Sequence, residues 1–177
     1  VDTCRTMFVA SYRVSVQPPS DSFPCQLADS PPLRYAIEKT FPESIQKISP
    51  LFCKSYNQAL QAEENNLDQI CGSGYRKALE YLIKDYLIFS KFKGDEKKKR
   101  AVLQSMLGNC IKNYIDDDRV KAVAERAAWL GNDETHYYRK WTDKDLDDLK
   151  TLISMTVNWI DLVVQSSNYI ESMPEPA

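Results

Sequence analysis

Apolar residues recur at three- and four-residue steps through most of the chain after position 41. The clearest stripe lies between Tyr75 and Leu87, and a second one lies between Leu146 and Val163. This period is typical of amphipathic helices that bury one face. We therefore predict that the fold class is mainly α, with a helical bundle over residues 41–167 and a flexible tail over 168–177.

The first forty residues follow a different pattern. Apolar and polar residues alternate from Met7 to Val16, which predicts a strand. A single strand is unstable, so it needs a partner from upstream residues, from a strand near Leu33–Ile37, or from another subunit. Residues 17–32 hold five prolines and predict a loop or linker. We take residues 1–40 as a separate segment.

Local signals predict several helix ends. Ser49-Pro50 is a cap followed by proline at the first helical position, where the missing N–H costs nothing. The acidic run Asp116 to Asp118 is suited to a helix N-terminus. Leu130-Gly131 predicts a helix end, with the glycine in a left-handed turn. Thr142 with Asp145 resembles a capping box at the start of the last helix.

Composition narrows the function classes. A formal charge of −2 argues against a general nucleic-acid coat, which needs a basic excess. No apolar run is long enough to span a bilayer, so we expect no membrane partner. The five cysteines are odd in number and form no Cys-x-x-Cys pair, which favours reduced thiols and a cytoplasmic location. Because the chain begins at Val1, we expect further residues upstream.

The polar chemistry is concentrated between Arg126 and Trp141, around the only histidine, His136. Aromatic residues that are able to stack on a ligand alternate here with charged ones. As binding candidates we name Arg126, Trp129, Asp133, Glu134, Tyr137, Lys140 and Trp141. The alternative is purely structural, because a histidine at a helix–loop junction often bonds to a backbone carbonyl.

Other sites have weaker support. The sequence holds no nucleophile motif, no glycine-rich phosphate loop and no set of residues with metal-ligand spacing. We therefore expect neither cofactor nor metal. The basic run from Lys97 to Arg100 fits either phosphate contact or a solvated helix start. Because Arg76, Glu80 and Lys84 align on one helix face, we hypothesise that Glu80 pairs with Arg126 or Arg139.

Three segments together resemble the bacterial DUF4145 family: GYRKALEYLIKDYL (74–87), ERAAWLGNDETHYYRKW (125–141) and DKDLDDLKTLI (143–153). The resemblance covers roughly residues 41–165. It implies an all-α bundle of a kind found alone and as an accessory domain of restriction and phage-defence proteins. Some of these proteins begin with a zinc-ribbon-like segment, and Cys4 and Cys25 are the residues here that resemble it.

DUF4145 is in turn distantly similar to the HEPN helical domains, many of which are metal-independent ribonucleases. Their motif is Arg–Asn–three residues–His, and Asn132 and His136 match it. Gly131 stands at the arginine position, so another cation has to stabilise the charged transition state. Arg139 is the nearest substitute, with Lys140 and Arg126 as alternatives. In such a reaction the histidine moves the proton of the 2′-hydroxyl or of the leaving oxygen. The HEPN resemblance also implies a homodimer.

Three functions follow from these observations. The first is a non-catalytic binding or regulatory module in bacterial defence or nucleic-acid transactions, with RNA, DNA or a defence-system protein as partner. The second is a metal-independent ribonuclease with His136, Asn132 and Arg139 as catalytic residues. The third is a structural dimerisation domain.

Overall fold

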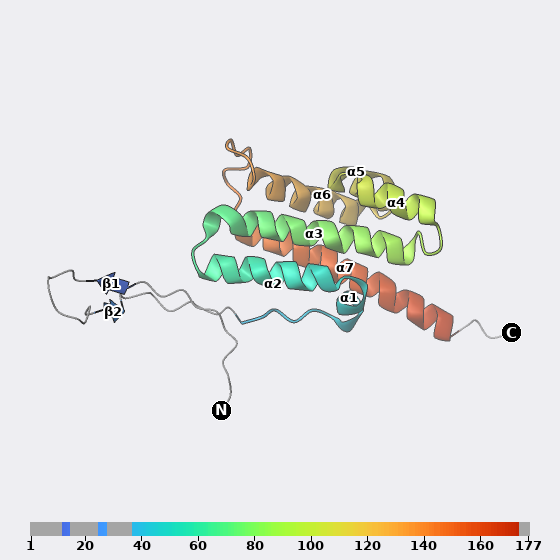
Figure 1. Ribbon diagram of the computed structural model, residues 1–177. Coiled ribbons are helices and arrows are strands. Elements are labelled where there is room, and N and C mark those ends of the chain that lie inside the picture. The colour runs from blue at the N-terminus through green and yellow to red at the C-terminus, as the bar shows by residue number, and fades with distance from the viewer. Residues whose placement is uncertain (1–11, 15–24, 28–36, 174–177) are drawn as a thin grey trace, which may run out of the picture. The chain divides into compact units, whose positions relative to one another are not determined.

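The computed structural model describes residues 12–14, 25–27 and 37–173 (Figure 1). Contacts divide the chain into two compact units, Val1–Arg34 and Tyr35–Ala177. Within the described residues, the second unit contains seven helices, which confirms the predicted mainly α-helical fold. Their bounds are α1 Glu43–Ile48, α2 Pro50–Glu64, α3 Asp68–Ser90, α4 Glu96–Gln104, α5 Leu107–Tyr114, α6 Asp118–Asp133 and α7 Leu146–Ser172.

The first unit contains a short antiparallel pair of strands, β1 (Tyr12–Val14) and β2 (Cys25–Leu27), in which Arg13 faces Gln26. The predicted strand therefore exists at Tyr12–Val14, while its other residues lie outside the described part. We expected its partner upstream, near Leu33–Ile37 or in another subunit, whereas the strand that pairs with it is β2. It comes from the proline-rich segment that we interpreted as loop, because three residues are too few to show an alternating pattern. The Cys4 half of the zinc-ribbon resemblance lies outside the described residues.

Helix α3 is the centre of the bundle and contacts the other six helices (Figure 1). Its predicted stripe is buried, and Tyr75, Leu79 and Ile83 are fully enclosed. Edge-to-face aromatic contacts join it to α2, with the Tyr56 and Tyr75 rings 4.9 Å apart. Such pairs add to the stabilisation from apolar burial. The core is therefore built around α3, as the apolar period indicates.

Several helix ends differ from the predictions. Proline stands at the first position of α2, but the Ser49 hydroxyl donates to the Asp85 carboxylate (2.5 Å) instead of capping the helix. The last helix begins one turn later than predicted, with Asp145 and Asp148 forming the capping box. This helix also continues to Ser172, so the first half of the predicted flexible tail (168–172) is helical. Residues 174–177 lie outside the described part.

Polar residues around the buried Tyr75 join α2, α3 and α7 in a cluster that we call the Tyr75 network (Glu63, Tyr75, Asp147 and Lys150). The Tyr75 hydroxyl donates to Glu63 (2.6 Å), and the Lys150 ammonium contacts both Glu63 and Asp147 at 2.7 Å. Burial lowers the pKa of Lys150, but its hydrogen bonds to Asp147 and Glu63 and their charges outweigh burial and raise it to about 12. The network thus holds a stable cation between three helices.

None of the helices in the described part combines the length and the apolarity needed to cross a lipid bilayer.

Candidate functional site

Helix α6 carries the start of the candidate site and does not end at Gly131. It continues to Asp133, so the predicted left-handed glycine turn is wrong. A Cβ at Gly131 would lie 2.7 Å from the Arg76 Cβ, well inside van der Waals contact. Gly131 is therefore needed for the close approach of α6 to α3, a packing reason that local sequence does not reveal.

Asp133 holds the segment that follows, residues 134–145, which we call the aromatic loop. Its side chain is buried, and one carboxylate oxygen accepts hydrogen bonds from the backbone N–H groups of Lys140 and Trp141, both at 2.8 Å. The two bonds bring the returning chain back to the end of α6. Asp133, a predicted binding residue, is thus used within the protein and supports the loop.

Glu134 and Arg139 are also engaged with each other. Their side chains form an ion pair at 2.6 Å, and Arg139 donates a further bond to the Lys144 carbonyl. The Glu134 side chain packs over Gly72, where an added Cβ would lie 2.5 Å away from it. Arg139 opens onto a pocket with Glu63 and Asp68, separate from the cleft that holds His136. The predicted convergence of Arg139 on His136 is therefore not observed.

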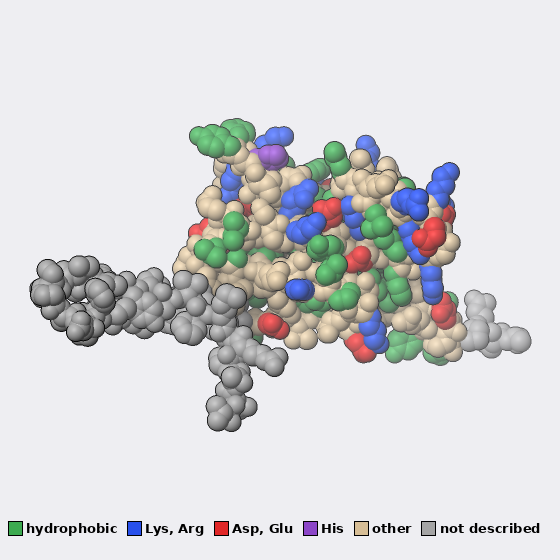
Figure 2. All heavy atoms as spheres, in the orientation of Figure 1, with side chains coloured by type: hydrophobic (Ala, Val, Ile, Leu, Met, Phe, Trp, Pro, Cys, Tyr) green, Lys and Arg blue, Asp and Glu red, His purple; other side chains and the backbone are tan. Residues whose placement is uncertain are grey.

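His136 lies in an open cleft of about 710 Å³, which we call the aromatic cleft. Its lining residues are Trp129, Asn132, Asp133, His136, Tyr137, Tyr138, Lys140 and Trp141. The His136 ring is exposed, and in the described part of the chain it makes no side-chain hydrogen bond or ion pair. Figure 2 shows it (purple) at the surface beside hydrophobic and basic side chains. The hydrogen bond to a backbone carbonyl that a purely structural role requires is therefore not observed among the described residues.

Asn132 connects the cleft to the central helix. Its amide oxygen accepts a hydrogen bond from Arg76 Nε (2.5 Å) on α3. Glu80 pairs with Arg76 and Lys84, so the hypothesis that Glu80 pairs with Arg126 or Arg139 is wrong. Arg76 was not predicted as a site residue, because it is more than fifty positions away along the chain.

Trp129 on α6 and Trp141 in the aromatic loop form a stacked pair. Their ring centroids are 6.5 Å apart and their planes differ by 4°. The rings are 44% and 43% exposed, which is high for tryptophan in a folded domain. The Arg126 guanidinium lies 5.9 Å from the Trp129 ring, within the range of a cation–π contact.

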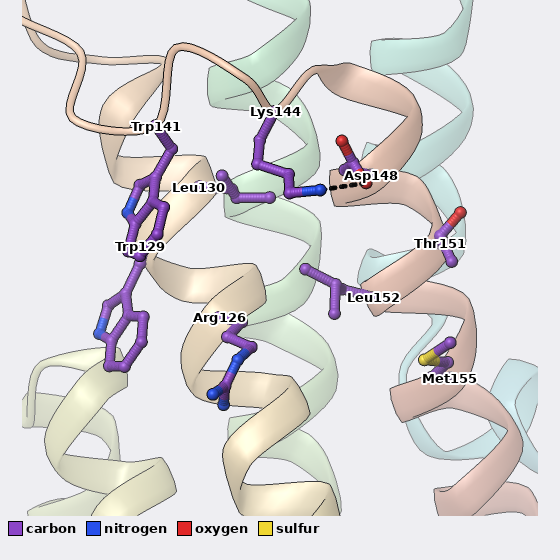
Figure 3. A pocket seen from close by; sticks show the side chains of 9 residues that line it. All are labelled: Arg126, Trp129, Leu130, Trp141, Lys144, Asp148, Thr151, Leu152 and Met155. Carbon is purple, nitrogen blue, oxygen red and sulfur yellow. Dashed lines mark ion pairs between the residues drawn. The ribbon is translucent and has the colours of Figure 1, made fainter.

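The same tryptophan pair also borders a second pocket, between α6 and α7, which we call the α6–α7 slot. Its volume is about 320 Å³, and Leu152 and Met155 of α7 line it opposite the tryptophans (Figure 3). Sequence reasoning missed these two residues. Leu152 lies at the margin of the predicted apolar stripe of α7, and a single exposed methionine beside that stripe does not indicate a site in the sequence.

The predicted site residues therefore fall into two groups. Asn132, Asp133, Glu134 and Arg139 bond to other parts of the protein, whereas Arg126, Trp129, His136, Tyr137, Lys140 and Trp141 present exposed side chains. Tyr138 joins the second group. This group combines stacking surfaces with positive charge, which suits planar, anionic ligands. Among the described residues, no His, Cys, Asp and Glu side chains gather in a way that could hold a metal ion.

Comparison of the chain with protein-family models, with curated proteins and with solved structures finds no match.

Proposed function

We propose that this protein is a non-catalytic binding module of the DUF4145 type whose aromatic cleft binds single-stranded nucleic acid. The observation that carries the proposal is the exposure of Trp129, Tyr137, Tyr138 and Trp141 around one cleft. Exposed apolar residues that cluster in one patch mark interaction sites and ligand-binding grooves, whereas scattered ones do not. The family resemblance extends the proposal to a role in bacterial defence.

Stacking on aromatic side chains is the main source of affinity for single strands, because every base has a π face. Lys140 lies in the cleft and Arg126 beside the shared tryptophans, so two cations are available for phosphates. A duplex keeps its bases stacked inside, where these rings do not reach them. The geometry therefore favours single strands over duplexes.

The proposal is tested by fluorescence anisotropy with labelled ten-nucleotide RNA, DNA and matched duplexes. We expect the single strands to bind more tightly than the duplexes. With two phosphate contacts, raising salt fourfold should weaken the binding by only about sevenfold. Equal binding of duplex and single strand, or a much steeper salt dependence, would mean that general electrostatics causes the binding.

Tyr137→Ala sharpens the test. Loss of one stacking contact should weaken binding by roughly 5- to 150-fold. Tyr169→Ala is the matched control, since Tyr169 is also exposed but lies near the end of α7. An equal loss of binding affinity in Tyr137→Ala and Tyr169→Ala would contradict a role for the aromatic cleft. Light scattering of the free protein and of the complex separates a binding module from a dimerisation domain, which forms its dimer without ligand.

One observation favours the ribonuclease as a second candidate. His136 is exposed, its ring has no partner among the described residues, and it lies in the same cleft as Asn132 and Lys140. Lys140, in place of Arg139, would be the cation that stabilises the phosphate charge. The test is incubation of labelled RNA in EDTA with the parent protein and with His136→Ala. If the parent cleaves RNA and His136→Ala does not, the reaction depends on His136. If the parent leaves DNA of the same sequence intact, the reaction also needs the 2′-hydroxyl.

A further inference from the structure

The α6–α7 slot has two unlike walls. On one side the Trp129 and Trp141 rings follow one another in nearly parallel planes. On the other side α7 presents Leu152 and the half-exposed Met155 (Figure 3). Indole rings opposite a thioether and an aliphatic side chain suit a flat ring, because aromatic rings pair edge-to-face or with an offset and methionine adapts to irregular neighbours.

Cations border this slot. Arg126 donates one bond to the Ala122 carbonyl of its own helix, and no carboxylate within the described ranges lies within ion-pair distance of its guanidinium. Lys144 pairs with Asp148 at 3.6 Å, and both side chains are more than one-third exposed. Such a surface pair contributes little and can exchange partners. The charged residues of the slot, two cations and one carboxylate, therefore favour an anion.

The size of the slot limits the ligand. About 320 Å³ is at the lower end of the range for small-molecule sites. It admits one base with its sugar and phosphate, and not a folded peptide segment. Thr151 adds an exposed hydroxyl that can donate to or accept from the edge of a base. Planar shape, negative charge and this size together describe a nucleotide unit.

We propose that the α6–α7 slot binds one nucleoside monophosphate unit, with the base between the tryptophan pair and Met155 and the phosphate beside Arg126. The unit has two possible sources, a free nucleotide or one nucleotide of a single strand. The second source rests on the proposed function, because the strand would continue into the aromatic cleft across the shared tryptophans.

The test follows the quenching of tryptophan fluorescence, and the heat of binding, during titration with AMP, with adenosine and with inorganic phosphate. We expect AMP to bind with a Kd of roughly 10 µM to 1 mM. Adenosine should bind about tenfold more weakly, because it lacks the charge that Arg126 attracts. Phosphate alone should not quench. Equal affinity for AMP and adenosine would contradict the role of Arg126.

Met155→Glu places a carboxylate in the slot and should weaken AMP binding by at least about tenfold through like-charge repulsion. Met106→Glu is the matched control, because Met106 is also exposed and lies at the start of α5, away from the slot. Circular dichroism of both variants checks the fold. Unchanged AMP binding in Met155→Glu would overturn the proposal, and so would an equal loss in the control.

The same variants, titrated with the labelled ten-nucleotide strands, distinguish the two sources and the two proposals. If strand binding falls in Met155→Glu, the slot takes a nucleotide of the strand. If AMP binds and the strands do not, the slot takes a free nucleotide and the proposed function fails. If the strands bind equally well to Met155→Glu and AMP does not bind, the slot proposal fails and the proposed function stands.

Discussion

The Tyr75 network and the aromatic loop contain the same types of residue in opposite environments. Tyr75 is fully buried, and its hydroxyl is bonded to Glu63, which Lys150 contacts in turn. Tyr137 and Tyr138 are exposed. Within the described part of the structure, neither side chain makes a ring contact or a hydrogen bond. Burial, followed by the bond and charge of Glu63, raises the pKa of Tyr75 and keeps it protonated.

The difference teaches that residue type alone does not identify a site. A tyrosine with a cation and a carboxylate can join helices or can contact a ligand. Which of the two it does depends on whether its polar atoms already have partners in the protein. The variants below separate the two environments through the free energy of unfolding, from the largest expected change to the smallest.

Gly131→Arg places arginine at the HEPN motif position and should cause the largest loss of stability. The added side chain meets Arg76 at 2.7 Å and must push α6 away from α3. Overpacking of this kind costs typically about 1–3 kcal/mol. The measurement is urea unfolding. Gly108→Arg is the control, because a Cβ there meets no atom within 4 Å. If Gly131→Arg and Gly108→Arg have the same free energy of unfolding, the close approach of α6 to α3 at Gly131 does not contribute to stability.

Tyr75→Phe breaks the Tyr75 network without changing its shape. It removes the hydroxyl that donates to Glu63, and a hydrogen bond to a charged group contributes roughly 1.5–3 kcal/mol. We expect the lower value, because Glu63 is partly exposed and water can replace the hydroxyl. Tyr138→Phe, in the aromatic loop, should leave the unfolding midpoint unchanged. A similar loss in both variants would remove the distinction between the two regions.

Asp85→Asn tests a partly buried carboxylate outside both regions. Burial raises the pKa of Asp85 above its ordinary 3.8, and the bond from Ser49 only partly offsets this. The folded protein therefore holds this proton more tightly than the unfolded chain. The carboxylate consequently lowers the free energy of unfolding as pH rises through the interval between 3.8 and the raised pKa.

We expect Asp85→Asn to be more stable than the parent at pH 7, by less than about 1 kcal/mol because the group is partly solvated. The asparagine oxygen can still accept the bond from Ser49. The advantage should disappear near pH 3, where both states of the parent are protonated. Melting temperatures of the two proteins at both pH values give the result. A constant difference between them would exclude this explanation.

Tyr137→Ala should have the smallest effect on stability. Its ring is exposed and contacts little, so we expect a change within about 0.5 kcal/mol. The same substitution should strongly weaken binding of single strands. A loss of stability comparable to that of Tyr75→Phe would show that the tyrosine supports the fold.

Local patterns in the sequence predict much of this fold. The apolar stripe of α3 needs only its own period to be recognised, and Asp117 caps α6 with bonds to Arg119 and Val120, within the predicted acidic run. The end of α6 was mispredicted because a glycine after leucine has the same local pattern at a helix end and inside a close helix pair. Only the distant Arg76 distinguishes the two cases.

The candidate site was predicted to a similar extent. His136, Tyr137 and Lys140 are neighbours in sequence, and the structure places them in one cleft. Arg139 was chosen by proximity, but its bond to Glu134 turns it to another pocket. Met155 comes from a different helix, and nothing in its local sequence distinguishes it from residues that face the core. Such long-range contacts are what a single sequence does not provide.

The two bonds that Asp133 makes to Lys140 and Trp141 have a consequence for engineering and for evolution. They hold the returning end of the aromatic loop, Lys140 and Trp141, to the end of α6, where Asp133 precedes the start of the loop. Residues 135–138 can then be replaced or lengthened without disturbing the helices, as at other exposed chain reversals whose ends are anchored. New specificities, whether selected in the laboratory or by nature, can be grafted there onto an unchanged scaffold.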